Sequence, residues 1–267
     1  MVKIKLFRVV SGTIQTLKEN KFLFEELVKR DFKKKYKRTV LGMLWSILSP
    51  LFMLLVMSLV FTHFFGRNIN HFVIYVFCGN IIYSYYNDST TQGMGSLLDN
   101  ASIFTKVNVP KYMFLLSKNV TSLINFGLTL VLLFIFAAID GVPFTWKFLL
   151  LIYPILCLII FNLGIGLILS ALYVMFRDMR YLYDIFKMAL VYFSAIFYDV
   201  STFDIKIQYL FYLNPIYVYI RYFRKIIIYD QIPSLGFHAL AVFYALAALL
   251  IGCLIYHRKN YKFLYYV

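Results

Sequence analysis

The sequence predicts an all-α membrane protein with six transmembrane helices, and three observations carry this prediction. Hydrophobic residues make up 62% of the 267 positions and charged residues only 15%, far from the composition of soluble domains. The apolar residues gather in runs of about 20, the length that crosses a hydrocarbon core as a helix. Most of the 27 Lys and Arg residues lie between these runs, as membrane topology requires.

The first expected element is an amphipathic helix over residues 22–38 that lies in the headgroup layer. Its apolar residues recur at helical spacing, as Phe24, Leu27, Val28, Phe32 and Tyr36 show. Basic residues alternate with them, namely Arg30, Lys33, Lys34, Lys37 and Arg38. An attraction of about 1 kcal/mol per basic residue to anionic lipid favours an interfacial helix over a solvated basic arm, which stays the alternative.

Six spans are expected over residues 40–65, 72–98, 114–139, 148–176, 181–198 and 237–256. The second is weaker because its second half is polar, and the fifth carries Asp184 and Lys187 near its start. With the N-terminus in the cytoplasm, most Lys and Arg residues fall on the inner side. The positive-inside rule therefore predicts that both termini are cytoplasmic.

The second span keeps an almost unbroken polar run from Asn80 to Gln92. Polar groups at membrane depth are expensive, so this run should face a partner helix, a second subunit or a water-filled path. Two interpretations stay open: the residues hold helices together, or they line a conduit.

The loop after the second span, residues 100–113, is too polar to span and too apolar for an idle linker. Ser102, Ile103, Phe104 and Val107 could present a short apolar face to a soluble partner, and Pro110 limits any helix before it. A simple turn along the headgroups is the competing interpretation.

A second irregular segment, residues 200–235, precedes the last span. Asn214 and Pro215 break the chain, and residues 216–229 are apolar yet too short to cross. Arg221, Arg224 and Lys225 share one helical face, where they could meet phosphate headgroups. This pattern predicts a re-entrant or interfacial helix pair at the outer mouth, with a plain surface loop as the alternative.

Catalytic and cofactor motifs are missing from the sequence. No Gly is followed by Lys, which excludes a Walker loop, and GxGxxG does not occur. The His and Cys residues lack metal-ligand spacing, and a membrane-embedded transferase would need paired acids or a metal site. The basic residues are not spread over one solvated face as nucleic-acid binding requires. We expect no catalytic residue, no metal and no nucleic-acid partner.

Four motifs in order resemble the permease subunits of type 2 ABC exporters for polysaccharides, with O-antigen and teichoic-acid exporters as the nearest relatives. They cover nearly the whole chain: RDFKKKYKRTVLGMLWSILSPLFMLLVMSLVF (30–61), NASIFTKVNVPKYMFLLSKNV (100–120), FRDMRYLYDI (176–185) and YLNPIYVY (212–219). The resemblance implies a homodimer in the plasma membrane of a bacterium. It also implies that a separate ABC ATPase subunit binds the ATP and Mg²⁺, and that the cargo is a lipid-linked polysaccharide.

The resemblance also implies roles for individual residues. The ATPase-coupling residues would be Ser102, Ile103, Phe104, Val107, Pro110 and Lys111, and the headgroup entrance would be framed by Arg30, Lys33, Lys34, Lys37 and Arg38. The outer gate would contain Pro215, Arg221 and Arg224. Because aromatic rings and amides hold sugars weakly at many points, the expected channel lining is Trp45, Phe52, Tyr83, Tyr85, Tyr86, Asn87 and Asp88. A permease of the same fold that exports a drug or a simple lipid is the alternative function.

Overall fold

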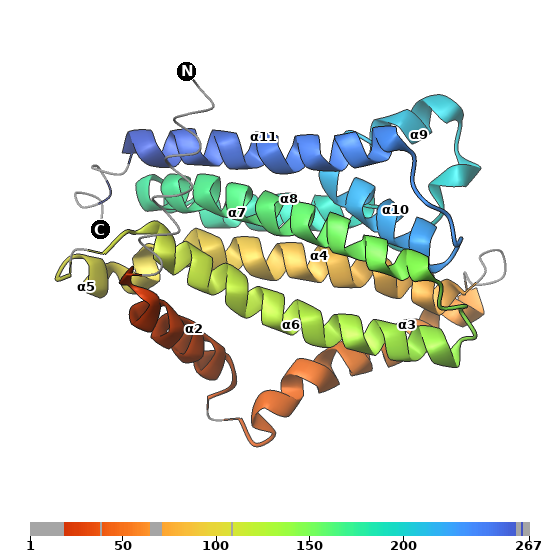
Figure 1. Cartoon of the computed structure of the whole chain (residues 1–267), viewed down its shortest axis with the longest axis horizontal. Helices are drawn as coiled ribbons and strands as arrows, with labels where there is room; N and C mark the ends of the chain where they lie inside the picture. Colours follow the sequence, from red (N-terminus) through yellow and green to blue (C-terminus); the bar gives the residue numbers. More distant parts are fainter. Residues whose placement is uncertain (1–18, 38, 65–70, 108, 260–262, 264–267) are drawn as a thin grey trace.

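A computed structural model describes residues 19–37, 39–64, 71–107, 109–259 and 263. In these residues the regular secondary structure is helical, with no strand, and long helices lie side by side along the long axis of the molecule (Figure 1). A helix satisfies its backbone hydrogen bonds within the segment, which is what a bilayer core demands. The elements are α2 (Lys21–Tyr36), η1 (Gly42–Leu44), α3 (Trp45–Phe64), α4 (Phe72–Gly95), η3 (Leu98–Asn100), α5 (Ala101–Phe104), α6 (Tyr112–Ile139), η4 (Trp146–Leu151), α7 (Ile152–Met175), α8 (Met179–Phe193), η5 (Val200–Thr202), α9 (Ile205–Phe211), α10 (Pro215–Ile227) and α11 (Leu235–Lys259).

Within the described residues, three helical stretches are long and apolar enough to cross a membrane: Tyr112–Ile139, Trp146–Met175 and Leu235–Lys259. Trp45–Val56 is a shorter apolar helix. The expected all-helical, multi-pass membrane class is confirmed at this level.

Two expected boundaries are wrong. The helix expected over residues 181–198 ends at Phe193, so α8 has 15 residues and a length of about 22 Å. It ends because Ala195 takes a left-handed backbone conformation with φ 50°, which an α-helix does not accommodate. The coupling helix expected over residues 100–113 is helical only through η3 and α5, and α6 begins at Tyr112. Pro110 disfavours a helix immediately before it, which accounts for the irregular stretch.

The tightest helix pair is α7 with α11, where small residues let the two backbones touch. A Cβ on Gly164 would lie 2.4 Å from the carbonyl carbon of Ala248, and a Cβ on Gly252 would lie 2.5 Å from the Gly164 carbonyl oxygen. On α11 these positions continue the buried series of Ala241 and Ala245. Small residues at such spacing let transmembrane helices gain van der Waals contact where hydrophobic driving force between helices is weak.

The bundle has two distinct ends (Figure 1). At one end, which we call the α5 end, α2, α5 and the last turn of α11 come together around a buried cluster that includes Leu27, Phe104 and Tyr256. The opposite α9 end holds α9 and the start of α11. Almost every residue of α10 is buried, and Tyr219 donates its hydroxyl to the Ala241 carbonyl on α11.

Candidate functional site

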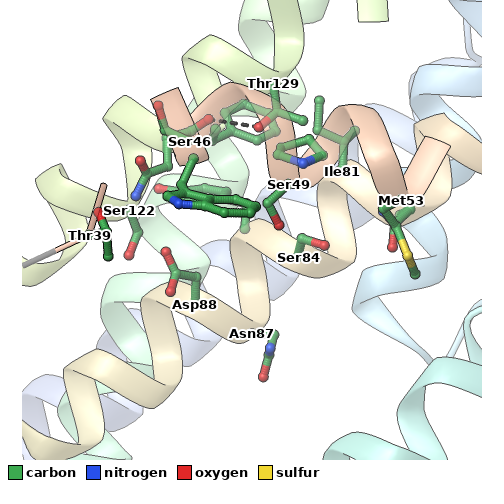
Figure 2. A pocket seen from close by; sticks show the side chains of 16 residues that line it. Thr39, Ser46, Ser49, Met53, Ile81, Ser84, Asn87, Asp88, Ser122 and Thr129 are labelled. Atoms are coloured by element: carbon green, nitrogen blue, oxygen red, sulfur yellow. Dashed lines mark hydrogen bonds between the residues drawn. The ribbon is translucent and has the colours of Figure 1, made fainter. Parts of the chain in front are cut away.

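A pocket of about 700 Å³ opens where α3, α4 and α6 meet (Figure 2). The middle residues of α6 line it, which places the pocket at membrane depth if α6 spans. In Figure 2 the side chains of Ser84 and Asp88 point from α4 toward Ser46 and Ser49 of α3. The lining residues are Thr39, Trp45, Ser46, Ser49, Pro50, Met53, Asn80, Ile81, Ser84, Tyr85, Asn87, Asp88, Ser122, Asn125, Phe126 and Thr129.

The lining combines hydroxyl, amide, carboxylate and aromatic groups. The Gln92 amide donates to Asp88 Oδ1 at 2.9 Å and to Ser122 Oγ at 3.3 Å, which ties the α4 carboxylate to α6. Trp45 keeps 39% of its surface exposed and so offers a ring face to a ligand. Such a lining can hydrogen-bond sugar hydroxyls and stack against the C–H faces of sugar rings.

Four of the expected lining residues meet at this pocket and three do not. Trp45, Tyr85, Asn87 and Asp88 line it. The hydroxyl of Tyr83 instead donates to the Lys187 carbonyl on α8. Tyr86 stacks on Phe161 of α7, and Phe52 lies outside the lining with half its surface exposed.

The polar residues of α4 serve both purposes that the sequence left open: some bind neighbouring helices, and others line the pocket. On one side it binds neighbouring helices: Tyr85 donates to Asn119 Oδ1 at 3.1 Å, and the Asn119 amide donates to Ser89 Oγ at 2.8 Å. Lys187 of α8 donates to Thr91 Oγ1 at 2.9 Å. On another side α4 faces the pocket, so one helix both fastens the bundle and lines a cavity.

Sequence reasoning missed the contributions of α3 serines and of α6. Ser46 and Ser49 are three residues apart, and Asn125 and Thr129 are four apart, so each pair shares a helix face. Polar pairs at helical spacing inside apolar spans were the available signal.

The residues expected to couple to an ATPase, at the α5 end, differ in accessibility. Ser102 and Val107 are exposed, and Ile103 and Pro110 are half-buried. Phe104 is buried against Phe114, with ring centroids 6.1 Å apart. The Lys111 ammonium lies 5.7 Å from the Phe104 ring centroid, and burial lowers the pKa of Lys111. Phe104 therefore anchors the segment of residues 101–111, and Val107 presents apolar surface outward.

The expected entrance helix α2 is fastened to α6 by a buried carboxylate that sequence reasoning overlooked. Asp31 accepts from Arg30 at 2.8 Å, from Ser117 at 3.3 Å, and pairs with Lys118 at 3.3 Å. Arg30 also donates to Asn100 Oδ1 at 2.7 Å, which brings η3 into the same cluster. Lys33, Lys34 and Lys37 are exposed, and Arg38 lies outside the described residues.

At the α9 end the structure corrects the expected position of Arg224. Arg224 was expected to face phosphate headgroups, but it is 3% exposed and donates to the carbonyls of Tyr75, Ala195 and Ile196. Its face of α10 turns into the protein because the three carbonyls satisfy the guanidinium there. Arg221 is half-buried and donates to the Tyr217 hydroxyl, while Pro215 opens α10 behind an Asn214 cap.

No group of three His, Cys, Asp or Glu residues that could hold a metal ion occurs in the part of the chain that the structure describes. Residues 23–228, most of the chain, match the family model described as "ABC-2 type transporter". The chain belongs to the ABC-2 type transporter family. The family that the four motifs predicted is thereby confirmed.

Three relatives of this ABC-2 permease carry the same printed name, "O-antigen export system permease protein RfbA". The Myxococcus xanthus protein is 30% identical over 189 residues, covering 71% of this chain and 73% of its own. Two Klebsiella pneumoniae proteins are 24% and 25% identical over 253 residues, each match covering 91% of this chain and 95% of the relative. The ABC-2 family consists of membrane subunits of transporters, so transport is the activity class of this chain.

Proposed function

We propose that this permease is the membrane subunit of an ATP-driven exporter that moves a lipid-linked polysaccharide from the cytoplasmic to the outer face of the bacterial plasma membrane. The pocket between α3, α4 and α6 is the observation that carries the proposal, because it gathers hydroxyl, amide and aromatic groups beside α6, a helix long and apolar enough to cross a membrane. The relatives named for O-antigen export support the polysaccharide cargo.

The proposed topology has six spans, formed by α3, α4, α6, η4 with α7, α8, and α11, and both termini in the cytoplasm. The α5 end is then the cytoplasmic side. The pair α9 and α10 is re-entrant from the outer side, a role supported by the shortness of α8 and by the burial of α10.

We further propose two partners, an ABC ATPase subunit and a second copy of this chain. The ATPase, which would bind ATP and Mg²⁺, docks at the α5 end over Val107 and Ser102. Its closure would move the α5 end and spread the two permease copies as rigid bodies. Basic residues of α2 would hold the lipid-linked headgroup and anionic lipids at the entrance.

Cysteine labelling along α4 tests the passage. Single cysteines at positions 84, 87 and 88, in a chain whose native cysteines are replaced, should react with a water-soluble thiol reagent in assembled, energised vesicles. Cysteines at 82, 89 and 90, which are buried on α4 and line neither cavity, provide the control and should stay unreactive. If none of the six cysteines reacts with the reagent, the proposed water-filled passage along α4 is wrong.

One observation favours the alternative of a simple lipid as cargo. A second cavity of about 520 Å³, bordered by α4, α7, α8 and the start of α10, has an almost wholly apolar lining that includes Phe161, Leu169 and Phe186. Such a lining suits an acyl chain. Depleting the permease decides between the two: a lipid-linked glycan accumulates inside if the cargo is a glycan, whereas the glycan is unchanged if the cargo is a simple lipid.

A further inference from the structure

We propose that Arg221 and Lys225 of α10 form a binding site for the phosphate headgroup of an anionic phospholipid at the α9 end, where the lipid holds α10 against the start of α11. The site lies apart from the pocket described above, which is lined from α3, α4, α6 and the segment before α3. Binding at this site depends on the lipid around the protein and not on the exported cargo.

The two positive charges lie close together. Arg221 and Lys225 are one helical turn apart, so their side chains leave the same face of α10. Both are half-buried, and both approach the ring of Phe237 on α11: the guanidinium carbon of Arg221 lies 5.9 Å and the Lys225 ammonium 4.8 Å from its centroid. Like charges at this spacing repel each other, so the arrangement favours an anion that contacts both.

Acidic side chains of the protein do not neutralise this pair. None of the acids that the structure describes, which are all twelve Asp and Glu residues of the sequence, forms an ion pair with Arg221 or Lys225. Asp230, three residues after α10, pairs instead with Lys147 of η4 at 2.6 Å. A half-buried charge without a counter-ion is costly, and an anion from outside the chain removes that cost.

The hydrogen-bond donors of Arg221 are also incompletely used. The neighbouring Arg224 donates to three backbone carbonyls, whereas Arg221 donates, among the described residues, to the Tyr217 hydroxyl at 3.0 Å. A guanidinium carries five N–H donors in a planar fork. The donors that remain on Arg221 suit phosphate oxygens, which arginine binds in a bidentate manner.

Aromatic rings hold the charged groups in place. The Arg221 guanidinium carbon lies 5.1 Å from the Tyr212 centroid and 5.9 Å from the Tyr217 centroid. Such contacts attract a cation to the ring but leave its charge unchanged, so the site is ordered and still positive. The dipole of α10 favours Lys225, which lies in the last turn, but does not account for Arg221, which lies before it.

Exposed apolar side chains near these rings favour a lipid over a free phosphate ion. Leu210 and Leu213 flank Tyr212 in the sequence and are 63% and 70% exposed, and Leu235, two residues before Phe237, is 87% exposed. In Figure 1 α9 and the start of α11 lie at the same end of the bundle. Basic groups beside exposed apolar and aromatic side chains are typical of a surface in the headgroup layer. A phospholipid matches both parts, whereas a free ion matches only the charges.

Lipid binding by the full chain, purified in dodecyl maltoside, tests the site. Native mass spectra recorded along a titration give the apparent Kd for dioleoyl phosphatidylglycerol, with dioleoyl phosphatidylcholine as the lipid without net charge. We expect the parent to bind phosphatidylglycerol more tightly. The double substitution Arg221→Gln and Lys225→Gln should raise that Kd by about tenfold or more, because each basic residue near a membrane surface contributes roughly a factor of five.

Two further variants make the result specific. Arg180→Gln with Lys206→Gln removes two exposed basic residues, one on α8 and one on α9, and should keep the Kd of the parent. Lys225→Gln alone removes a single ring contact, so it tests the site if the double variant yields little monodisperse protein. Its Kd should rise by about fivefold.

Free anions test the source of the phosphate. Inorganic phosphate and glycerophosphoglycerol, which is the headgroup without acyl chains, should raise the Tm of the parent less than phosphatidylglycerol does. An equal rise that is lost in the Arg221→Gln and Lys225→Gln variant would show that the ligand is a free phosphate and not a lipid. Phosphatidylglycerol binding that survives this variant, or that falls equally in the Arg180→Gln and Lys206→Gln control, would overturn the site itself.

Discussion

At the scale of single residues, Arg224 shows how an arginine can be buried at the end of a membrane bundle. Its guanidinium donates to three backbone carbonyls and lies 3.4 Å from the centroid of the Tyr75 ring. Gly79 leaves it room, because a Cβ there would approach Arg224 Nη2 to 3.0 Å. Two of the carbonyls belong to the turn after α8, so this side chain fixes where α8 stops.

Replacing Arg224 by Lys should therefore destabilise the fold. A lysine ammonium cannot match the planar fork of donors, and unsatisfied buried carbonyls cost about 1–3 kcal/mol each. Thermal unfolding of the purified chain in detergent should show a Tm several degrees lower. Arg180→Lys, at an exposed position on α8, is the control and should change Tm little. Equal effects of the two substitutions would contradict the special role of Arg224.

Two apolar residues of the proposed coupling segment, Phe104 and Val107, should respond differently to aspartate. Val107→Asp changes an exposed side chain, so the protein should remain folded and membrane-inserted but lose most of its coupling to the ATPase partner. Phe104→Asp places a charge in the buried cluster and should lower the yield of folded protein. Comparing ATP hydrolysis per molecule exported with the yield of monodisperse protein separates the effects. Normal export by Val107→Asp would place the ATPase contact elsewhere.

At the scale of helices, backbone contact between α7 and α11 depends on the missing Cβ atoms of Gly164 and Gly252. Gly164→Val would drive side-chain atoms into the Ala248–Leu249 backbone, so the helices must separate and lose their packing. We expect little folded, monodisperse protein from this variant. Gly127→Val is the matched control on α6, because a Cβ there meets nothing within 4 Å. Similar yields from both would show that the α7–α11 contact is not critical.

The attachment of α2 to α6 depends on the buried Asp31–Lys118 pair. Asp31→Asn leaves the Lys118 ammonium buried with only the half-exposed Asp99 at 3.9 Å, a loss of about 3 kcal/mol. A second substitution, Lys118→Met, should restore much of the stability, since removing both charges spares their desolvation. Thermal unfolding measures both. Glu26→Gln, which breaks an exposed pair with Lys29, is the control. An unchanged Tm for Asp31→Asn would show that the pair does not hold α2.

At the scale of the whole molecule, the pocket is incompletely covered by one chain. Ser49 and Ser84 are exposed and Asn87 is half-buried, on helices proposed to lie at membrane depth, where polar surface facing lipid is costly. A second copy assembled around the same space would cover them. The purified chain should therefore show a protein mass twice the 31.5 kDa of one copy in light scattering corrected for detergent. A transport-competent preparation with the mass of one copy would contradict the assembly.

Local sequence patterns were sufficient to predict the positions of most of the long helices. The apolar runs placed α3, α4, α6, α7 and α11 close to their observed positions, because a membrane helix needs only length and apolarity along its own sequence. The pair Asn214 and Pro215 marked the start of α10 for an equally local reason, since the Asn214 side chain caps the helix and Pro suits its first turn.

The amino-acid sequence by itself determined the membrane class, the family and the existence of polar residues within apolar helices. Only the tertiary structure decided which of those polar residues meet: that Asp88 faces a pocket while Tyr83 binds α8, that Arg224 turns inward, and that Asp31 finds Lys118. The reason is physical. Helical periodicity depends on residues that are neighbours in sequence. A buried polar group, in contrast, is stabilised by a hydrogen-bond or charge partner on another helix, and the position of that partner depends on the packing of the whole bundle.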